Sequence, residues 1–321
     1  MKRRLFTQAA LGAAAATCAG LARAQSWPAK PVTCVVGYAP GGGVDFVMRS
    51  VAPALSARLG QQFVIDNRPG ASGIIAARLV TSAQPDGYTL FGSDGGALVL
   101  NSALYNSLPY DPRDFLAVSQ LISVPMLVVA HPSVPANNLK ELVELSKRQP
   151  LSYASVGKGS YHHLAMEVLK KRAGFEAQDV TYKGAGPASQ DVVAGQVPVM
   201  TLDCIVALPH LRAGKLKALA ALSPKRLPAL PQVPTAAEQG VTDAESSAWV
   251  GVAAPKGTPR DIVTRLHREL KAVVAMPEID KRFTDMGMVP VANTPEEFAA
   301  VIGAEIRRYH PLVKSLDLRL D

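Results

Sequence analysis

The chain has 321 residues, of which 48% are hydrophobic, and this length and apolar content allow two sizeable cores. The formal charge is +8, but the first 24 residues contribute four basic side chains and no acid, so the remainder is only slightly basic. No block of Lys and Arg is interleaved with aromatic residues, which argues against nucleic-acid binding, and no nucleic-acid partner is expected.

An export signal is predicted at the N-terminus. The basic start Lys2–Arg4 is followed by the apolar small-residue run Ala9–Leu21 and by Ala22-Arg23-Ala24, a pattern that precedes signal-peptide cleavage. We expect cleavage after Ala24, so that residues 1–24 are removed and the mature chain is periplasmic. The order Arg3-Arg4-Leu5-Phe6 resembles a twin-arginine signal, which would mean export after folding. An ordinary signal with an arginine-rich start explains the same residues.

The first elements of the mature chain are a strand, a glycine loop and a helix. The β-branched run Val32–Val36 predicts a strand, and a helical apolar pattern begins near Val44, after a corner that contains Tyr38. Between them stands Gly41-Gly42-Gly43, whose backbone N–H groups can converge at a helix N-terminus, where the helix dipole favours an anion. We therefore expect an anion cradle here. Asp45 would either stabilise the start of the helix or receive a ligand amine or bridging water.

The next segments repeat the alternation of strand and helix. A strand is predicted at Phe63–Ile65, a helix at Ile74–Ser82 and a strand at Tyr88–Gly92, which favours a mostly parallel sheet covered on both faces. Ser72 lies in the turn that opens this helix. Ser93-Asp94 follows the third strand, at the edge where open α/β sheets bind ligands, so all three side chains are candidate ligand contacts.

A second α/β unit is predicted after a crossing near residues 123–126. Pro125 separates an apolar run at Leu116–Ile122 from a strand at Met126–Ala130. Further strands are expected at Leu151–Val156, Val180–Tyr182, Val199–Leu202 and Leu216–Leu222, and a return strand at Trp249–Ala253. The predicted domains are residues 25–124 with 250–321, and residues 125–249. A chain that leaves one domain and then returns to it has the layout of a hinged clamshell.

A second glycine loop stands at Gly157-Lys158-Gly159-Ser160, again between a strand and a helix. Ser160 is placed to cap the helix, and its hydroxyl could also donate to a bound carboxylate. Lys158 would add charge for an acidic ligand or be solvated at the loop tip, and His163 would be a packed histidine or a ligand contact. Two later residues have equally open roles: Tyr182 in the core or the pocket wall, and Asp203 at the cleft or at a helix cap.

Motifs for catalysis and for metal binding are missing from the sequence. It contains no G-x-S-x-G, G-x-x-x-x-G-K-[ST] or H-E-x-x-H pattern. His162 and His163 would diverge by about 100° on a helix, too far to chelate one metal well. We therefore expect no metal and no cofactor. Cys34 and Cys204 lie in separate apolar runs and are predicted to be buried free thiols.

A series of short motifs runs through nearly the whole mature chain. They read Trp27-Pro28, Tyr38-Ala39-Pro40-Gly41-Gly42 with Asp45, Asn67-Arg68-Pro69-Gly70, Pro85-Asp86-Gly87-Tyr88-Thr89-Leu90, Asp111-Pro112, Gly157 with Gly159-Ser160 and His163-Leu164, Tyr182-Lys183-Gly184, and Ala254-Pro255 with Gly257-Thr258-Pro259. In this order and spacing they resemble the Bug-type periplasmic solute-binding receptors of tripartite tricarboxylate transport.

This resemblance implies a two-domain Venus-flytrap protein of the type II-like α/β class, each domain a mainly parallel sheet flanked by helices. In that family the loops that match Tyr38–Asp45 and Gly157–Ser160 hold ligand carboxylates through main-chain amides, hydroxyls and ordered waters. The implied partners are a small organic acid or amino acid and the membrane permease subunits of a tripartite tricarboxylate-type transporter, and a monomer is expected. Two residues depart from the family pattern: Asp94 would repel an extra carboxylate and welcome an amine, whereas Lys158 favours an acid.

The function predicted from the sequence is an extracytoplasmic, catalytically inert receptor that closes two lobes on a small carboxylate. The predicted ligand-binding residues are Tyr38, Gly41, Gly42, Asp45, Ser72, Ser93, Asp94, Gly157, Lys158, Gly159, Ser160, His163, Tyr182 and Asp203. Two alternatives remain open. One is an extracytoplasmic enzyme on an anionic substrate with Ser160, His163 and Asp203 as working groups. The other is a receptor that serves a sensor protein instead of a permease.

Overall fold

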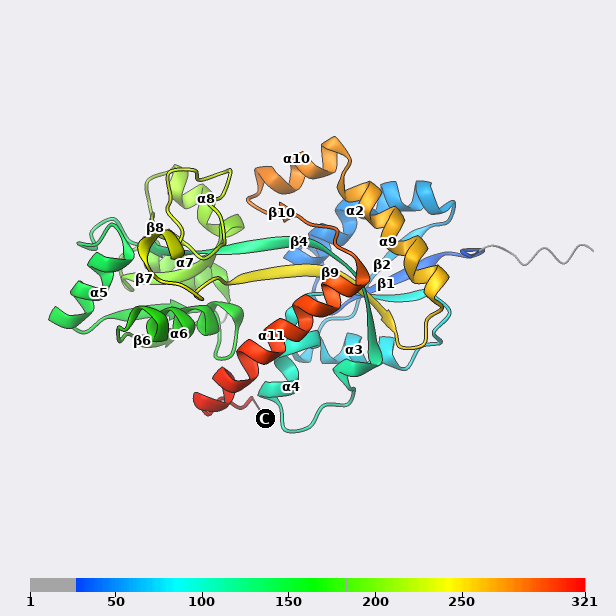
Figure 1. Ribbon diagram of the computed structural model, residues 1–321, viewed down its shortest axis with the longest axis horizontal. Helices are drawn as coiled ribbons and strands as arrows, with labels where there is room; N and C mark the ends of the chain where they lie inside the picture. The colour runs from blue at the N-terminus through cyan, green and yellow to red at the C-terminus, as the bar shows by residue number, and fades with distance from the viewer. Residues whose placement is uncertain (1–26, 183, 321) are drawn as a thin grey trace, which may run out of the picture.

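The computed structural model describes residues 27–182 and 184–320, so the predicted export signal lies outside the described residues. Two α/β lobes lie side by side and are joined by the long strands β4 (Phe115–Ala130) and β9 (Ser247–Pro255) (Figure 1). Within the described ranges, none of the helices combines the length and the apolar character that crossing a bilayer requires.

The first lobe is built on three parallel strands, in the order β2-β1-β3. Its elements are β1 (Val32–Val36), α2 (Gly43–Leu59), β2 (Phe63–Asn67), η1 (Ala71–Gly73), α3 (Ile74–Thr81), β3 (Thr89–Ser93), η2 (Gly96–Leu100), α4 (Asn101–Leu104) and η3 (Pro112–Asp114). The predicted alternation of strand and helix is confirmed. Pro53 lies inside α2, which ends at the left-handed Gly60 with a φ of 70°. The turn of π-helix η2 directly after the Asp94 loop was not predicted.

The second lobe repeats this plan around three parallel strands, in the order β7-β5-β6. Its elements are α5 (Leu139–Arg148), β5 (Ser152–Ser155), α6 (Tyr161–Ala173), β6 (Gln178–Thr181), α7 (Ala185–Val193), β7 (Val199–Asp203), α8 (Cys204–Arg212), β8 (Lys217–Ala221) and η4 (Ala237–Gln239). In both lobes a buried apolar strand therefore leads into a glycine loop and a helix, as the sequence predicts.

Strand β4 corrects the prediction of two separate segments around Pro125. Phe115 to Pro125 pairs antiparallel with β9, and the following residues to Ala130 pair antiparallel with β7 and β8. Pro125 lies where β4 changes its pairing partner from β9 to β7. Proline has no backbone N–H, and a strand loses little stability when a ladder hydrogen bond is missing at such a point. The antiparallel strands β4, β8 and β9, together with the short β10 (Val289–Pro290), make each sheet mixed around a parallel core.

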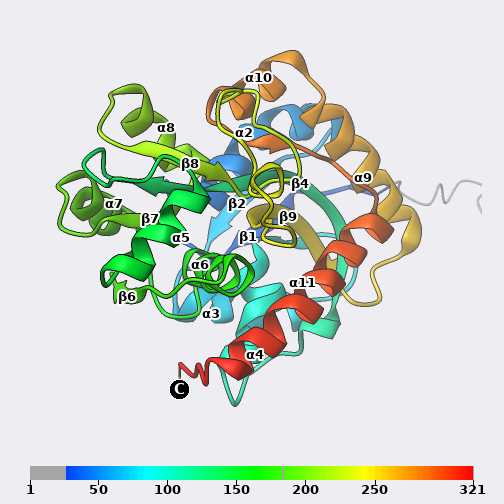
Figure 2. The same ribbon diagram turned by 60° about the vertical axis from the view of Figure 1, so that its left-hand side comes forward.

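The last elements connect both lobes. They are α9 (Arg260–Val274), α10 (Pro277–Asp285), β10 (Val289–Pro290) and α11 (Pro295–Ser315). Helix α9 packs on α2, whereas α11 contacts α4 of the first lobe and α6 of the second (Figure 2). Helix α11 begins with a capping box, which Thr294 and Glu297 form. The domain boundaries given above stay a prediction.

Cys34 and Cys204, the two cysteines of the described residues, are buried free thiols, as predicted. Cys34 lies on β1 with its Sγ 3.7 Å from the Met48 Sδ, and Cys204 begins α8. Burial raises the pKa of each thiol to about 12. Neither thiol is therefore a reactive thiolate at neutral pH.

Candidate functional site

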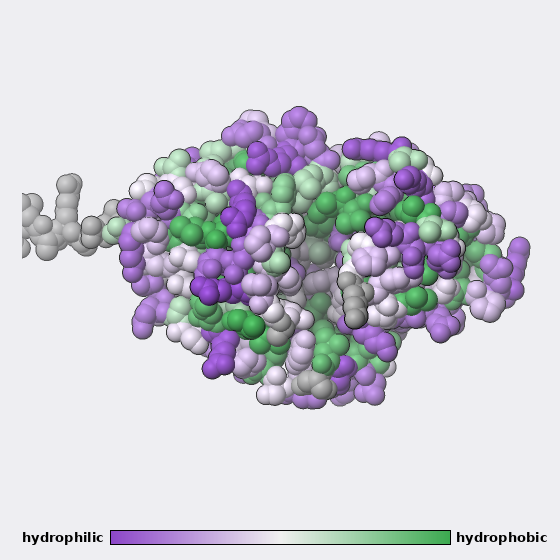
Figure 3. Space-filling model, turned by 180° about the vertical axis from the view of Figure 1, so that it is seen from behind, coloured by the Kyte–Doolittle hydropathy of each residue, from purple (hydrophilic) through white to green (hydrophobic). Residues whose placement is uncertain are grey.

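A cavity of about 590 Å³ lies where the two glycine loops approach each other. Its polar lining includes Tyr38, Gly42, Gly43, Ser72, Asp94, Gly96, Asn101, Gly157, Lys158, Gly159, Ser160, Tyr161, His162, Asp203 and Trp249. Its aliphatic lining comprises Val44, Val47, Leu100, Leu104, Ile122, Val124, Val156, Ile205, Ala248, Val250, Met288 and Leu320. Figure 3 shows the molecule hollowed between its two halves, with hydrophobic residues deep inside. The predicted loops thus meet at one cavity.

In the first glycine loop, the start of α2 lines the cavity, whereas the Asp45 carboxylate is hydrogen-bonded within the first lobe. The Asp45 carboxylate accepts hydrogen bonds from Gly41 N at 2.8 Å, Arg49 Nε at 2.9 Å and Asn67 Nδ2 at 2.9 Å. Burial alone would raise the pKa of Asp45, but these bonds lower it below the ordinary value. Gly41 and Asp45 are not part of the cavity lining, and their role as ligand contacts stays a prediction. Gly42 and Gly43 do line it.

The second glycine loop lines the cavity along its whole length, from Gly157 to Ser160. Gly157 and Gly159 have φ angles of 130° and 74°, in the region that favours glycine. Ser160 caps α6: its Oγ accepts from His163 N at 3.2 Å and donates to the Gly157 carbonyl at 2.7 Å. Lys158 is exposed at the loop tip. Both alternatives for Ser160 therefore stay compatible, since a capping hydroxyl also lines the cavity.

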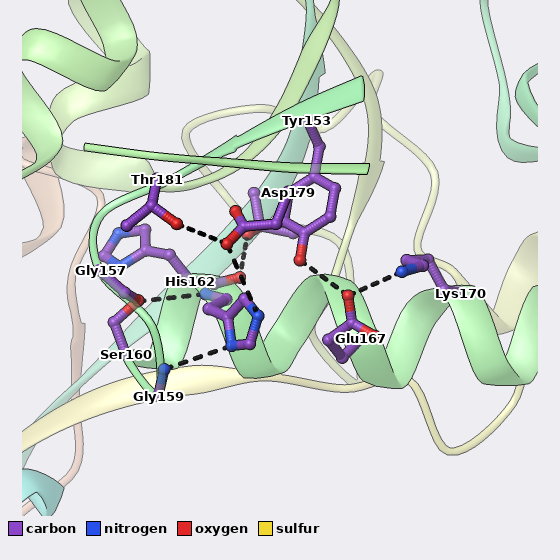
Figure 4. A network of polar contacts seen from close by, with 11 residues as sticks. Tyr153, Gly157, Gly159, Ser160, His162, Glu167, Lys170, Asp179 and Thr181 are labelled. Carbon is purple, nitrogen blue, oxygen red and sulfur yellow. Dashed lines mark hydrogen bonds and ion pairs between the residues drawn. The ribbon is translucent and has the colours of Figure 1, made fainter. Parts of the chain in front are cut away.

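His163 holds this loop from behind and does not line the cavity. Its side chain is 5% exposed, and its Nδ1 accepts a hydrogen bond from Gly159 N at 3.3 Å. Because a backbone N–H can only donate, the proton of the neutral ring is on Nε2, which lies 3.9 Å from Asp179 Oδ2. Asp179 in turn accepts from Thr181 Oγ1 at 2.6 Å (Figure 4). His163 is thus a packed histidine, the first of its two predicted roles, and a contact with the ligand stays a prediction.

Replacing His163 with Phe should weaken ligand binding several-fold, because the Gly159 N–H loses its acceptor, a bond worth about 0.5–1.5 kcal/mol. Burial lowers the pKa of His163. The positive charges of Lys170 and Lys158 lower it further, and the negative charges of Asp179 and Glu167 raise it in part. Protonating Nδ1 removes the acceptor. The affinity of the wild-type protein should therefore fall only when the pH drops below 6.5, the ordinary pKa of a histidine.

Calorimetric titration between pH 5 and 8 checks the His163 prediction. His131→Phe is the matched control, because His131 Nδ1 also accepts from a backbone N–H, that of Ser133 at 3.2 Å, but lies away from the cavity. We expect the control to bind like wild type. Equal affinity and equal pH dependence of both variants would contradict a role for His163 in positioning the loop.

Asp94 lies at the cavity wall, where it accepts hydrogen bonds but has no ion-pair partner among the described residues. Its Oδ1 accepts from the Tyr38 hydroxyl at 2.8 Å and from Gly96 N at 2.9 Å. Burial raises the pKa of Asp94, and these two bonds oppose the rise only in part. Ser72, with a φ of 51°, also lines the cavity, and its Oγ lies 3.4 Å from the Tyr105 hydroxyl. The predicted contacts Tyr38, Ser72 and Asp94 are therefore brought together.

Two further predicted contacts lie outside the cavity lining. Ser93 is 1% exposed, and its Oγ donates to the Asp94 carbonyl at 3.0 Å, because the end of β3 is packed inside the first lobe. The Tyr182 hydroxyl donates to Asp191 Oδ2 at 2.7 Å, and this bond raises the Tyr182 pKa to about 12. Each of these two polar groups is engaged with its own lobe, and their roles as ligand contacts stay predictions.

Sequence reasoning missed His162, the histidine that does line the cavity. Its Nε2 lies 2.8 Å from Asp203 Oδ2, and its carbonyl accepts from Thr201 Oγ1 at 2.6 Å. The pair of adjacent histidines at the start of a helix was visible, but only the packing of α6 shows which one faces the cavity. Among the described residues, no group of three His, Cys, Asp or Glu side chains is arranged to hold a metal ion.

Tyr161 and Trp249 were also missed, and they join the cavity to α11. The Tyr161 hydroxyl and the Trp249 Nε1 donate to Glu305 Oε2 at 2.7 and 2.9 Å. A Cβ added at Gly95 would overlap the Tyr161 hydroxyl, so the first-lobe loop lies directly against the start of α6. These contacts tie together a loop of each lobe and the helix that spans them.

The family model described as tripartite tricarboxylate transporter family receptor matches residues 47–318. A protein of R. palustris solved with adipate is 35% identical, over 92% of this chain and 100% of that one, with a TM-score of 0.79. The periplasmic binding protein BugD is 34% identical over 92% and 100%, with a TM-score of 0.75. MatC from Rhodopseudomonas palustris with bound malate is 34% identical over 89% and 100%, with a TM-score of 0.74.

Proposed function

The chain belongs to the tripartite tricarboxylate transporter family of receptors, and from this premise we propose that it captures a small carboxylate-bearing metabolite by closing its two lobes on it. Members of this family are periplasmic solute-binding proteins. The observation that carries the proposal is a single cavity lined by Gly42 and Gly43 at the start of α2 and by Gly157–Ser160 at the start of α6.

Main-chain N–H groups would supply most of the binding energy. The first N–H groups of an α-helix have no acceptor within it, and the helix dipole favours an anion at that end. Each hydrogen bond to a carboxylate contributes about 1.5–3 kcal/mol, so a few of them suffice for tight binding without a paired arginine. Neither lobe alone supplies every donor, which couples binding to closure.

The remaining parts of the proposal concern location and delivery. We propose that the export signal directs the chain to the periplasm, with cleavage after Ala24, and that the closed receptor acts as a monomer. It would hand its ligand to the membrane permease subunits of a tripartite tricarboxylate-type transporter. A pull-down from membrane fractions tests this partner, since a receptor for a sensor protein would retain the sensor instead.

The arrangement of the polar groups favours a receptor over the alternative enzyme. His163 Nδ1 accepts from Gly159 N, and Asp203 pairs with His162 instead of His163. The Ser160 Oγ donates its proton to the Gly157 carbonyl and not to an imidazole nitrogen. Ser160, His163 and Asp203 are therefore not aligned as nucleophile, base and orienting acid.

Trp249 provides the test of carboxylate capture. It is buried at the cavity wall, whereas Trp27 packs against Tyr88. In Trp27→Phe, titration with adipate, malate and longer monocarboxylates should produce a saturable fluorescence change with at least one ligand class. Trp249→Phe should lose this signal while calorimetry still detects binding. A folded Trp27→Phe protein that responds to no carboxylate in either assay would exclude the proposed function.

A further inference from the structure

Asp94 lines the cavity, and its carboxylate accepts hydrogen bonds from the described residues at one oxygen. The Tyr38 hydroxyl and Gly96 N both approach Oδ1, which leaves Oδ2 for a ligand. The residue is half-buried and belongs to the cavity lining. Because the Tyr38 and Gly96 bonds hold the carboxylate at a set position, Oδ2 is a directed acceptor and not a mobile surface group.

The charge of Asp94 has no partner within the described part of the chain. No Lys, Arg or His side chain there forms an ion pair with it, whereas the other cavity carboxylate, Asp203, is paired with His162. Glu305, hydrogen-bonded to Trp249 and Tyr161 behind the same wall, supplies no positive charge to Asp94 either. A half-buried carboxylate without a counter-charge is unfavourable, and a ligand cation would relieve that cost.

The rest of the lining limits where a second ligand carboxylate could go. The basic side chains of the lining, Lys158 and His162, both come from the second loop and the start of α6, the side that also carries the Gly157–Ser160 amides. Twelve aliphatic residues line the remaining wall, and they favour an apolar body over further charge. The cavity therefore offers one anion-binding end, an apolar wall and one acceptor of negative charge.

We infer that Asp94 makes this receptor select a carboxylate that also carries an ammonium group on an apolar body, in preference to a plain dicarboxylate. The inference rests on the proposed function, because it assumes that the glycine loops hold the carboxylate. The ligand ammonium donates to Asp94 Oδ2 while the apolar chain lies along the aliphatic wall. Asp94 is thus the specificity-determining residue of the cavity.

Three six-carbon probes test this selection, because they differ in one terminal group only. They are 6-aminohexanoate, hexanoate and adipate. A fourth probe, norleucine, carries its ammonium group beside the carboxylate instead of at the far end of the chain. In wild-type protein we expect an amino-bearing probe to bind about tenfold or more tighter than hexanoate, and adipate to bind weakest. The advantage of the amino probe should grow as pH rises, since Asp94 must be ionised to accept it.

Asp94→Asn should remove this preference. The amide oxygen can keep the bonds from Tyr38 and Gly96, so the wall stays in place while the charge is lost. We expect the amino probes to lose about tenfold in affinity and adipate to gain. Asp191→Asn is the matched control, because Asp191 also accepts a tyrosine hydroxyl, that of Tyr182, but lies outside the cavity lining.

The outcomes separate the inference from the function on which it rests. If neither these probes nor any other carboxylate binds, the proposed function itself fails. If hexanoate or adipate binds and neither amino probe exceeds hexanoate, the receptor stands and the inference is overturned. The inference is also overturned if an amino probe binds best but Asp94→Asn leaves its advantage unchanged.

Discussion

Replacing Gly159 with Val is expected to abolish ligand capture while the protein remains folded. Gly159 has a φ of 74°, where a β-branched residue is strained by about 1–2 kcal/mol. A Cβ at this position would lie 2.6 Å from Leu104 Cδ2, which belongs to α4 of the first lobe. The added side chain would therefore press the second glycine loop away from α4 of the first lobe unless Leu104 shifts, and we expect a loss of affinity of about a hundredfold.

Two other glycines separate the causes of this loss. Gly157→Val shares the positive φ, at 130°, but its Cβ meets nothing within 4 Å, so it should lose less affinity than Gly159→Val. Gly186→Val in the first turn of α7 has neither feature and should bind like wild type. Calorimetric titration with the best carboxylate of the panel measures all three. A Gly159→Val protein that binds within about threefold of wild type would contradict closure through this contact.

Replacing Glu305 with Gln is expected to stabilise the protein at alkaline pH and to have little effect at acidic pH. Burial raises the pKa of Glu305 to about 7 from 4.5, despite hydrogen bonds from Tyr161 and Trp249. At pH values between 4.5 and about 7, the Glu305 carboxyl is protonated in the folded state and ionised in the unfolded state. The contribution of Glu305 to the free energy of unfolding of the wild-type protein is therefore fully present below pH 4.5 and is lost as the pH rises through about 7. The loss amounts to at most about 3 kcal/mol.

A glutamine avoids this loss because its amide oxygen can accept both hydrogen bonds without a charge. Urea unfolding at pH 5 and pH 8 gives the free energy of unfolding of each protein. We expect Glu305→Gln to exceed wild type at pH 8 only, and Glu176→Gln, at an exposed acid outside the helices, to match wild type at both. An equal difference between Glu305→Gln and wild type at both pH values would refute the assignment.

Much of the architecture could be predicted because its signals are local. The β-branched run Val32–Val36 favours a strand, Gly37 ends it, and helical spacing follows the three glycines from Val44. The cap at Thr294 is equally local, since residues within one turn form it. The strand β4 was divided wrongly at Pro125 because the site where a strand changes partners depends on distant strands.

The polar site was less predictable, because hydrogen bonds within each lobe compete with a ligand for the same groups. Asp45 and Ser93 were expected at the cavity, but nearby donors and acceptors engage them inside the first lobe. His162 and His163 are adjacent in sequence, and the packing of α6 alone places one at the cavity and the other behind the loop. Tyr161 and Glu305 are 144 residues apart, so no local pattern could join them.

The sequence by itself determined the strands, the helices and the two glycine loops, because the periodicity of apolar residues and the missing Cβ of glycine act over a few neighbouring residues. Only the tertiary structure decided which side chains of those loops face the cavity and which are used within their own lobe. The reason is that a polar group goes to whichever partner folding brings within about 3 Å, and that partner can stand anywhere in the chain.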